Sequence, residues 1–119
     1  MTCPALHYIV ILRYNNMTRL PKKPALPDQQ LQDFLEAIAS RTRQKLLLAF
    51  LDGRERTVNE LVSYSGLGQS TVSAHLTALY RGGLLNREKR GKEVYYLPDR
   101  QSIQGALRRL SSYLENCCP

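Results

Sequence analysis

The sequence has few cysteines, no apolar run long enough to span a membrane and no pattern typical of a secretion signal. Its 119 residues include three cysteines, two of them adjacent, which is not the pattern of a disulfide framework, so we expect a reducing cytosol. The apolar stretch at residues 3–12 is far too short to span a bilayer. No basic segment precedes it and no small-residue cleavage site follows, so we expect no secretory signal and no membrane partner.

Catalytic constellations are also scarce. The two histidines are His7 and His75, so His75 is the only one beyond the N-terminal stretch, and no cysteine or acid pairs with it locally. No phosphate-binding glycine loop is present, because the glycines at 66, 68, 82 and 83 fall at turns. We therefore expect that the chain is not an enzyme.

Acidic residues are fewer than basic ones. Ten acidic residues face 17 lysines and arginines, which gives a formal net charge of +7. A basic excess of this size suits a polyanion, either nucleic acid or an acidic membrane surface. On charge alone, a soluble basic protein with no such partner explains the excess equally well.

The chain divides at about residue 27. Residues 1–27 hold a short β-like run and a proline-rich stretch with no helical period, which predicts an arm or disordered tail. Alternatively, Met17 is the true start and residues 1–16 are translated upstream sequence. Residues 28–119 form the second unit, a single folded domain.

Four helices are predicted between Asp28 and Gly82. An apolar stripe follows Asp28, a second helix runs from Arg41 to Gly53 after a Ser40 cap, and a third spans 57–66. The third begins with Thr57 and Glu60 in a capping-box arrangement. In the second, the apolar run 46–51 covers more than one face, so we expect it at the centre of the core. A glycine-containing turn then leads to the fourth helix, QSTVSAHLTALYR, which completes a helix-turn-helix unit.

The remaining segments predict a β-hairpin and a last helix. LLNREKRGKEVYYL has two β-prone arms around Arg90–Gly91, and residues 99–118 are again helical in period. Gly105 costs that helix about 1 kcal/mol relative to alanine, so packing must compensate. The predicted fold is mainly α with a small β-hairpin, a winged helix-turn-helix in the order of four helices, two strands and a helix.

Several motifs resemble the ArsR/SmtB family of bacterial winged-helix repressors. LVSYSGLGQSTVSAHLTAL is similar to the helix-turn-helix block of that family, and LYRGGLLNREKRGKEVYYL to its wing. IASRTRQKLLLAFLDG resembles a third block, although Ser40 and Arg41 stand where Asp-Pro is usual. The resemblance covers about 28–118 and implies a cytoplasmic, nucleoid-associated bacterial homodimer. Such a dimer represses its own operon and leaves DNA when an inducer binds.

Candidate DNA contacts follow from this order of elements. Small hydroxyl and amide side chains at the start of the fourth helix can approach base edges and phosphates closely. His75 lies at the margin of the apolar stripe, where a packed core role and a DNA contact are both open. The wing cations would follow the DNA backbone or the adjacent minor groove, although charged hairpin tips are usually only solvated. The candidates are Gln69, Ser70, Thr71, Ser73, His75, Thr77 and Arg81 in the helix, and Arg87, Lys89, Arg90 and Lys92 in the wing.

The predicted dimer interface uses the terminal helices, as the resemblance implies. The apolar residues assigned to it are Leu31, Phe34, Leu35, Ile103, Leu107, Leu110 and Leu114. Two other readings stay open: a winged-helix module that binds proteins and not DNA, and a family member that senses no metal.

The signal that this chain senses is less constrained. Thr57 and Asn59 stand where arsenic and cadmium/lead sensors of the family carry Cys-x-Cys, and they cannot supply thiolate ligands. The zinc-sensor pattern on the last helix keeps both carboxylates but lacks both histidines, so tight zinc sensing is not expected. Cys117 and Cys118 remain as a site for arsenite or antimonite, or as redox thiols. The alternative is that they are inert cysteines in a frayed tail.

Overall fold

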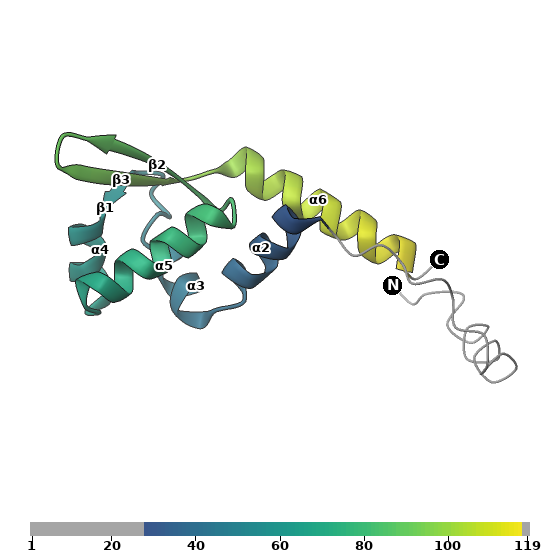
Figure 1. Cartoon of the computed structure of the whole chain (residues 1–119), viewed down its shortest axis with the longest axis horizontal. Helices are drawn as coiled ribbons and strands as arrows, with labels where there is room; N and C mark the ends of the chain where they lie inside the picture. The colour runs from purple at the N-terminus through teal and green to yellow at the C-terminus, as the bar shows by residue number, and fades with distance from the viewer. Residues whose placement is uncertain (1–27, 118–119) are drawn as a thin grey trace, which may run out of the picture.

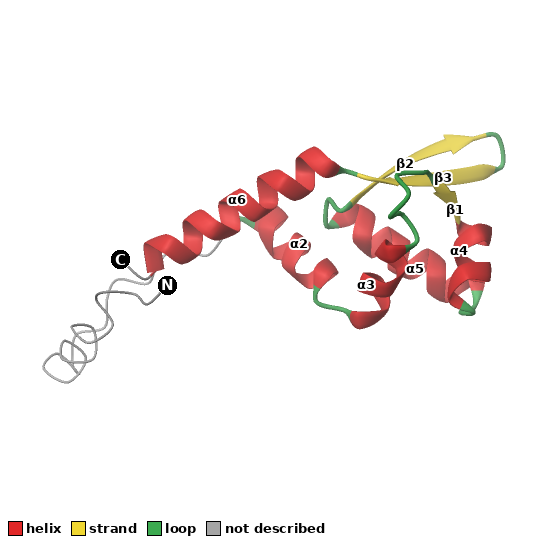
Figure 2. Cartoon of the chain, turned by 180° about the vertical axis from the view of Figure 1, so that it is seen from behind, coloured by secondary structure: helices red, strands yellow, loops and turns green. Residues whose placement is uncertain are grey.

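A computed structural model describes residues 28–117, and these form a helical domain with a small antiparallel sheet (Figures 1 and 2). The helices are α2 (Gln29–Ile38), α3 (Arg41–Leu48), α4 (Val58–Ser65), α5 (Gln69–Arg81) and α6 (Arg100–Cys117). The strands are β1 (Arg56–Thr57), β2 (Leu85–Arg90) and β3 (Glu93–Pro98), in the sheet order β1-β3-β2. This confirms the predicted winged helix-turn-helix, and the expected N-terminal arm lies outside the described residues.

Local signals set the helix starts. Asp28 accepts a hydrogen bond from the Leu31 N–H, and Ser40 accepts one from the Arg43 N–H, as N-caps do. Thr57 and Glu60 form both halves of a capping box at the start of α4. These three caps place the starts of the helices within a residue or two of the predicted positions.

The core is built from leucines that several helices contribute to one cluster. Val72, Leu76 and Leu79 of α5 have no exposed surface, so this helix forms the centre of the domain. Leu84, Leu85 and Tyr96 bring the base of the hairpin into the same cluster, which anchors the wing to the helices. Burial of each such side chain contributes about 1.5–3 kcal/mol before the entropy cost of folding.

The second predicted helix ends earlier than its sequence indicated. Helix α3 stops at Leu48, and three successive hydrogen bonds of the i to i−3 type follow, from the N–H groups of 49, 50 and 51. This tighter turn brings Phe50 into the core but leaves Leu48 53% and Leu51 81% exposed. The expectation that the whole run 46–51 lies at the centre of the core is therefore wrong for these two leucines.

Strand β1 was not predicted. Its two residues pair with β3, Arg56 opposite Tyr96 and Thr57 opposite Tyr95. A two-residue strand has no periodicity to detect, so only the proximity of β3 defines it. Its consequence is that the start of α4 is hydrogen-bonded directly to the wing.

Candidate nucleic-acid interface

Helix α5 carries the first half of the candidate interface. Its apolar stripe is buried, and its other side places Gln69, Ser70 and Thr71 in solvent at the N-terminal turn, with Arg81 exposed at the C-terminal end. The N-cap is Gly68, and no side chain caps the helix. The first N–H groups of α5 are therefore open to an outside acceptor such as a phosphate.

Three of the predicted recognition residues are only half-buried, and two of them have partners inside the domain. The Thr77 hydroxyl donates to the Ser73 carbonyl at 2.9 Å, within the helix. The Arg43 side chain donates to His75 Nδ1 at 3.3 Å and also to the Glu36 and Ala37 carbonyls at the end of α2. His75 thus links α5 to the preceding helices through Arg43, which matches the packed role that the sequence left open.

The wing, formed by β2 and β3 in Figure 1, carries the second half of the candidate interface. Contacts within the domain divide its four cations into two groups. The Arg87 guanidinium lies 4.0 Å from the centre of the Tyr80 ring on α5, a cation–π contact. Arg90 makes a bidentate ion pair with Glu55, at 2.6 and 2.9 Å, and a second pair with Glu88 at 2.9 Å. The hydrogen bonds that Arg90 donates to these carboxylates raise the pKa of Arg90 and hold the pKa of Glu88 below its usual value.

Lys89 and Lys92 form the other group. Both are exposed, and neither takes part in an ion pair among residues 28–117. Gly91 lies between Arg90 and Lys92 at the tip, with a φ of +61° that glycine adopts without strain. Among the four wing cations, the two lysines therefore have neither an ion pair nor a cation–π contact within the described residues, which leaves their charges available to a polyanion.

A hollow of about 150 Å³ joins the two halves of the interface. It lies between the start of α4, the start of α5 and the strand β3, and Lys92 and Gln69 both line it. Sequence reasoning missed Asn59 and Glu93 as members of this group, because nothing local indicates that β3 folds against these helix starts. Its full lining is Thr57, Val58, Asn59, Gln69, Lys92, Glu93 and Val94.

The candidate thiol site is described only in part. Cys117 is exposed at the end of α6, and its Sγ donates to the Leu114 carbonyl at 3.1 Å. Cys118 and Cys3 lie outside the described residues. Among residues 28–117, no group of three or more histidine, cysteine, aspartate or glutamate side chains is arranged to hold a metal ion.

The predicted dimer surface divides between core and exposed residues. Leu31 and Phe34 are 2% and 3% exposed, since they pack inside the protomer, and this corrects their assignment to a dimer interface. Leu107 and Leu114 of α6 are each 51% exposed, while Leu35, Ile103 and Leu110 are partly buried against the core. Among the residues assigned to the dimer interface, the exposed apolar ones therefore belong to α6.

Comparison with known proteins gives consistent matches. A family model described as "Bacterial regulatory protein, arsR family" matches residues 40–87, from the cap of α3 to the first half of β2. The transcriptional activator HlyU of Vibrio cholerae is 36% identical over 76 residues, 64% of this chain and 69% of HlyU. The transcriptional repressor PagR of Bacillus anthracis is 29% identical over 79 residues, 66% of this chain and 79% of PagR.

Solved structures agree with the fold. Reduced HlyU superposes with a TM-score of 0.53 at 36% identity, over 68% of this chain and 87% of that one. A homodimeric winged helix-turn-helix DNA-binding domain from Mycobacterium bovis superposes with a TM-score of 0.57 at 24% identity, over 79% of this chain and 91% of that one. The second similarity establishes the fold alone. Within the described range, none of the helices has the length and apolarity needed to cross a membrane.

Proposed function

The chain belongs to the ArsR family of bacterial regulatory proteins, and on that premise we propose that it is a homodimeric, sequence-specific DNA-binding repressor released from its operator by an inducer. The observation that carries the proposal is the exposed polar start of α5, where Gln69 shares a hollow with Lys92 of the wing. The relatives are regulators of transcription, in agreement with the expectation of a non-enzymatic chain.

In the proposed complex, α5 reads the major groove and the wing follows the backbone. Gln69, Ser70 and Thr71 have short polar side chains at the exposed N-terminal turn, the part of a recognition helix that contacts base edges. Lys89 and Lys92 supply phosphate contacts, which position the protein but carry no sequence information. Arg81 and Arg87 flank this surface, and Ser73 and Thr77 contribute from half-buried positions, whereas His75 is held inside the domain by Arg43.

A mobility shift on the DNA upstream of the gene tests the proposal. Gln69→Ala and Thr71→Ala are expected to lower the preference for that DNA over a scrambled duplex, by about 1–3 kcal/mol where a good base contact is lost. Lys89→Ala is expected to weaken binding to both duplexes equally. Arg108→Ala, an exposed cation on α6, is the matched control and leaves both affinities unchanged. No specific shift at low salt would contradict the central claim.

Dimerisation completes the proposal. The M. bovis domain is described as homodimeric, and α6 of this chain presents Leu107 and Leu114 half exposed along 18 residues. A pair of recognition helices related by a two-fold axis would read two half-sites about one helical turn apart. The operator is then expected to be an inverted repeat.

One observation favours a second direction of regulation. HlyU is named as a transcriptional activator, whereas PagR is named as a repressor. The same DNA-binding surface serves either outcome, because the effect depends on where the operator lies relative to the promoter. A reporter fused to the upstream DNA separates them: deletion of the gene raises expression if the chain represses and lowers it if the chain activates.

For the inducer we keep the thiol hypothesis, in which Cys117 and Cys118 bind arsenite or antimonite or are oxidised. The exposed Cys117 thiol supports access by such reagents. Changing both cysteines to serine is expected to abolish release from DNA by arsenite or by peroxide. Release that is unchanged with both reagents removes these thiols as the sensor.

A further inference from the structure

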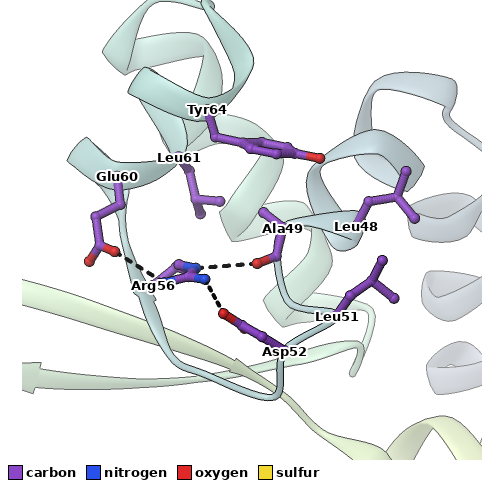
Figure 3. A pocket seen from close by; sticks show the side chains of 8 residues that line it. All are labelled: Leu48, Ala49, Leu51, Asp52, Arg56, Glu60, Leu61 and Tyr64. Atoms are coloured by element: carbon purple, nitrogen blue, oxygen red, sulfur yellow. Dashed lines mark hydrogen bonds and ion pairs between the residues drawn. The ribbon is translucent and has the colours of Figure 1, made fainter.

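A hollow of about 360 Å³ opens between the end of α3, the turn after it and α4 (Figure 3). In Figure 3 the Tyr64 ring lies on one side, Arg56 on the opposite side, and Leu48 and Leu51 at the margin. No residue of α5, of the wing strands β2 and β3, or of α6 lines it, so neither the DNA surface nor the α6 face covers it. Its lining is Leu48, Ala49, Leu51, Asp52, Arg56, Glu60, Leu61 and Tyr64.

The apolar side chains that line this hollow are exposed to water, which is unfavourable in free energy. Leu48, Leu51 and Tyr64 are 53%, 81% and 56% exposed, whereas the neighbouring Leu46 and Leu61 are fully buried. They cluster because the tightened turn after α3 directs Leu48 and Leu51 outward on the side of α4. An apolar cluster that neither the core nor the DNA surface uses is typical of a binding site.

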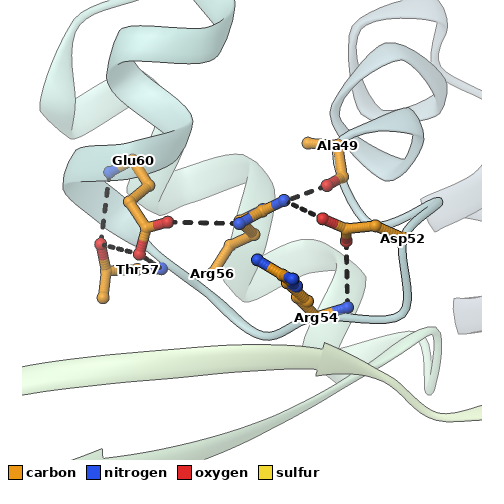
Figure 4. A network of polar contacts seen from close by, with 6 residues as sticks. All are labelled: Ala49, Asp52, Arg54, Arg56, Thr57 and Glu60. Atoms are coloured by element: carbon orange, nitrogen blue, oxygen red, sulfur yellow. Dashed lines mark hydrogen bonds and ion pairs between the residues drawn. The ribbon is translucent and has the colours of Figure 1, made fainter.

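The polar end of the hollow is a network around Arg56 (Figure 4). Its guanidinium donates to the Ala49 carbonyl at 3.2 Å, pairs with Glu60 at 3.5 Å and forms a close ion pair with Asp52. The Arg54 backbone N–H, followed by the charge of Arg56, lowers the pKa of Asp52, which favours its ionised form. Two carboxylates and one guanidinium therefore line the hollow, and their sum is one negative charge.

We propose that this hollow binds a small organic cation with an apolar or aromatic body. The body lies between Leu48, Leu51 and the Tyr64 ring, and the cationic group lies beside the Asp52 and Glu60 carboxylates. The Tyr64 ring can pack against an aromatic body, and the volume falls within the range of small-molecule sites, about 300–1,000 Å³. Three of the N–H groups of Arg56 already have acceptors in the protein, and two of these acceptors are the Asp52 and Glu60 carboxylates, which disfavours an anionic ligand.

The segment behind the hollow connects it to the wing. Arg56 belongs to β1 and pairs with Tyr96 of β3, and the preceding residue, Glu55, holds Arg90 of β2 in its bidentate pair. A cation that competes with Arg56 for Asp52 and Glu60 changes the position of this segment and so the hold of Glu55 on the wing. The effect on DNA binding rests on the proposed function; the ligand site itself does not.

Three probes of nearly equal size test the ligand class in calorimetry with the full chain: 3-phenylpropylammonium, 3-phenylpropan-1-ol and 3-phenylpropionate. We expect the ammonium to bind about tenfold or more tightly than the propionate, because the lining is net negative. Leu51→Ser and Tyr64→Ser are expected to weaken its binding, whereas Leu97→Ser, an exposed leucine outside the hollow, leaves it unchanged. Equal binding of all three probes, preference for the anion, or unaffected hollow variants overturns the proposal.

The connection to the wing has a readout that needs no DNA. Saturation with the ammonium probe is expected to shift the amide resonance of Gly91 at the wing tip. Glu55→Gln removes that shift but leaves the calorimetric affinity unchanged, since Glu55 does not line the hollow. An unmoved Gly91 resonance in the native chain contradicts the connection. Neither the calorimetry nor the Gly91 measurement involves DNA. Both therefore test the ligand site even if the proposed DNA binding is wrong.

Discussion

Single residues set how closely the helices approach. Gly82 follows α5, and a Cβ built on it would lie 2.5 Å from the Ala37 Cβ and 2.9 Å from the Asp33 carbonyl oxygen of α2. Its φ of −76° suits any residue, so space and not backbone conformation requires glycine here. The adjacent Gly83 is different, since its φ is +78°. The sequence signal was the pair of glycines after a helix, but the reason for the first one is tertiary.

We predict that Gly82→Ala lowers the free energy of unfolding by about 1–3 kcal/mol, because α2 and α5 must separate to admit the methyl group. Denaturant unfolding measures the change. Gly68→Ser is the contrasting control: its position is open, and the new hydroxyl can cap α5, which stabilises the domain by a few tenths of a kcal/mol. Equal effects of the two substitutions would show that the contact with α2 is not what requires Gly82.

At the scale of elements, the ion pair between Arg90 and Glu55 ties the wing to the domain, so the wing is not a free basic loop. The sequence predicted the same DNA-contacting role for all four cations near the turn. In the fold, Arg90 is shared between Glu55, 35 residues away, and Glu88. A pair of that sequence separation cannot be inferred from local pattern, because it depends on where the loop before β1 comes to lie.

This division predicts different salt dependences for two neighbouring cations. The plot of log affinity against log salt has a negative slope. Lys92→Ala is expected to make this slope less steep by about 0.9, the value for one phosphate contact. Arg90→Ala is expected to change the slope less, since Arg90 exchanges two carboxylates for the phosphate. Fluorescence anisotropy at several salt concentrations measures both. The wing makes no phosphate contact through Lys92 if the slope of that variant equals that of the native chain.

For the whole molecule, one long amphipathic helix is left with an exposed apolar face. Helix α6 packs partly on α2, where Arg109 pairs with Asp28 at 3.0 Å, yet Leu107 and Leu114 remain half exposed. Gly105 of the same helix has no atom within 4 Å of a Cβ built on it, so packing inside the protomer does not compensate for its low helix propensity. Both features are accounted for if a second copy packs on α6.

We predict that the double variant Leu107→Asp, Leu114→Asp is monomeric at micromolar concentration, because two buried charges would oppose association. Sedimentation equilibrium measures the state. Leu51→Asp introduces a charge at another exposed leucine, outside the α6 face, and is expected to remain dimeric. A native chain that is itself monomeric would contradict the proposed dimer directly.

The sequence by itself determined the helices, their caps, the hairpin and the order that makes a winged helix-turn-helix. Those features depend on short-range physics: helical period, side-chain capping over three residues and glycine at turns. Only the tertiary structure decided the short β1 strand, the burial of Leu31 and Phe34, the outward turn of Leu48 and Leu51, and the pairing of Arg90 with Glu55. Each of these features depends on contacts between segments that are distant in the sequence. The periodicity within one segment does not predict such contacts.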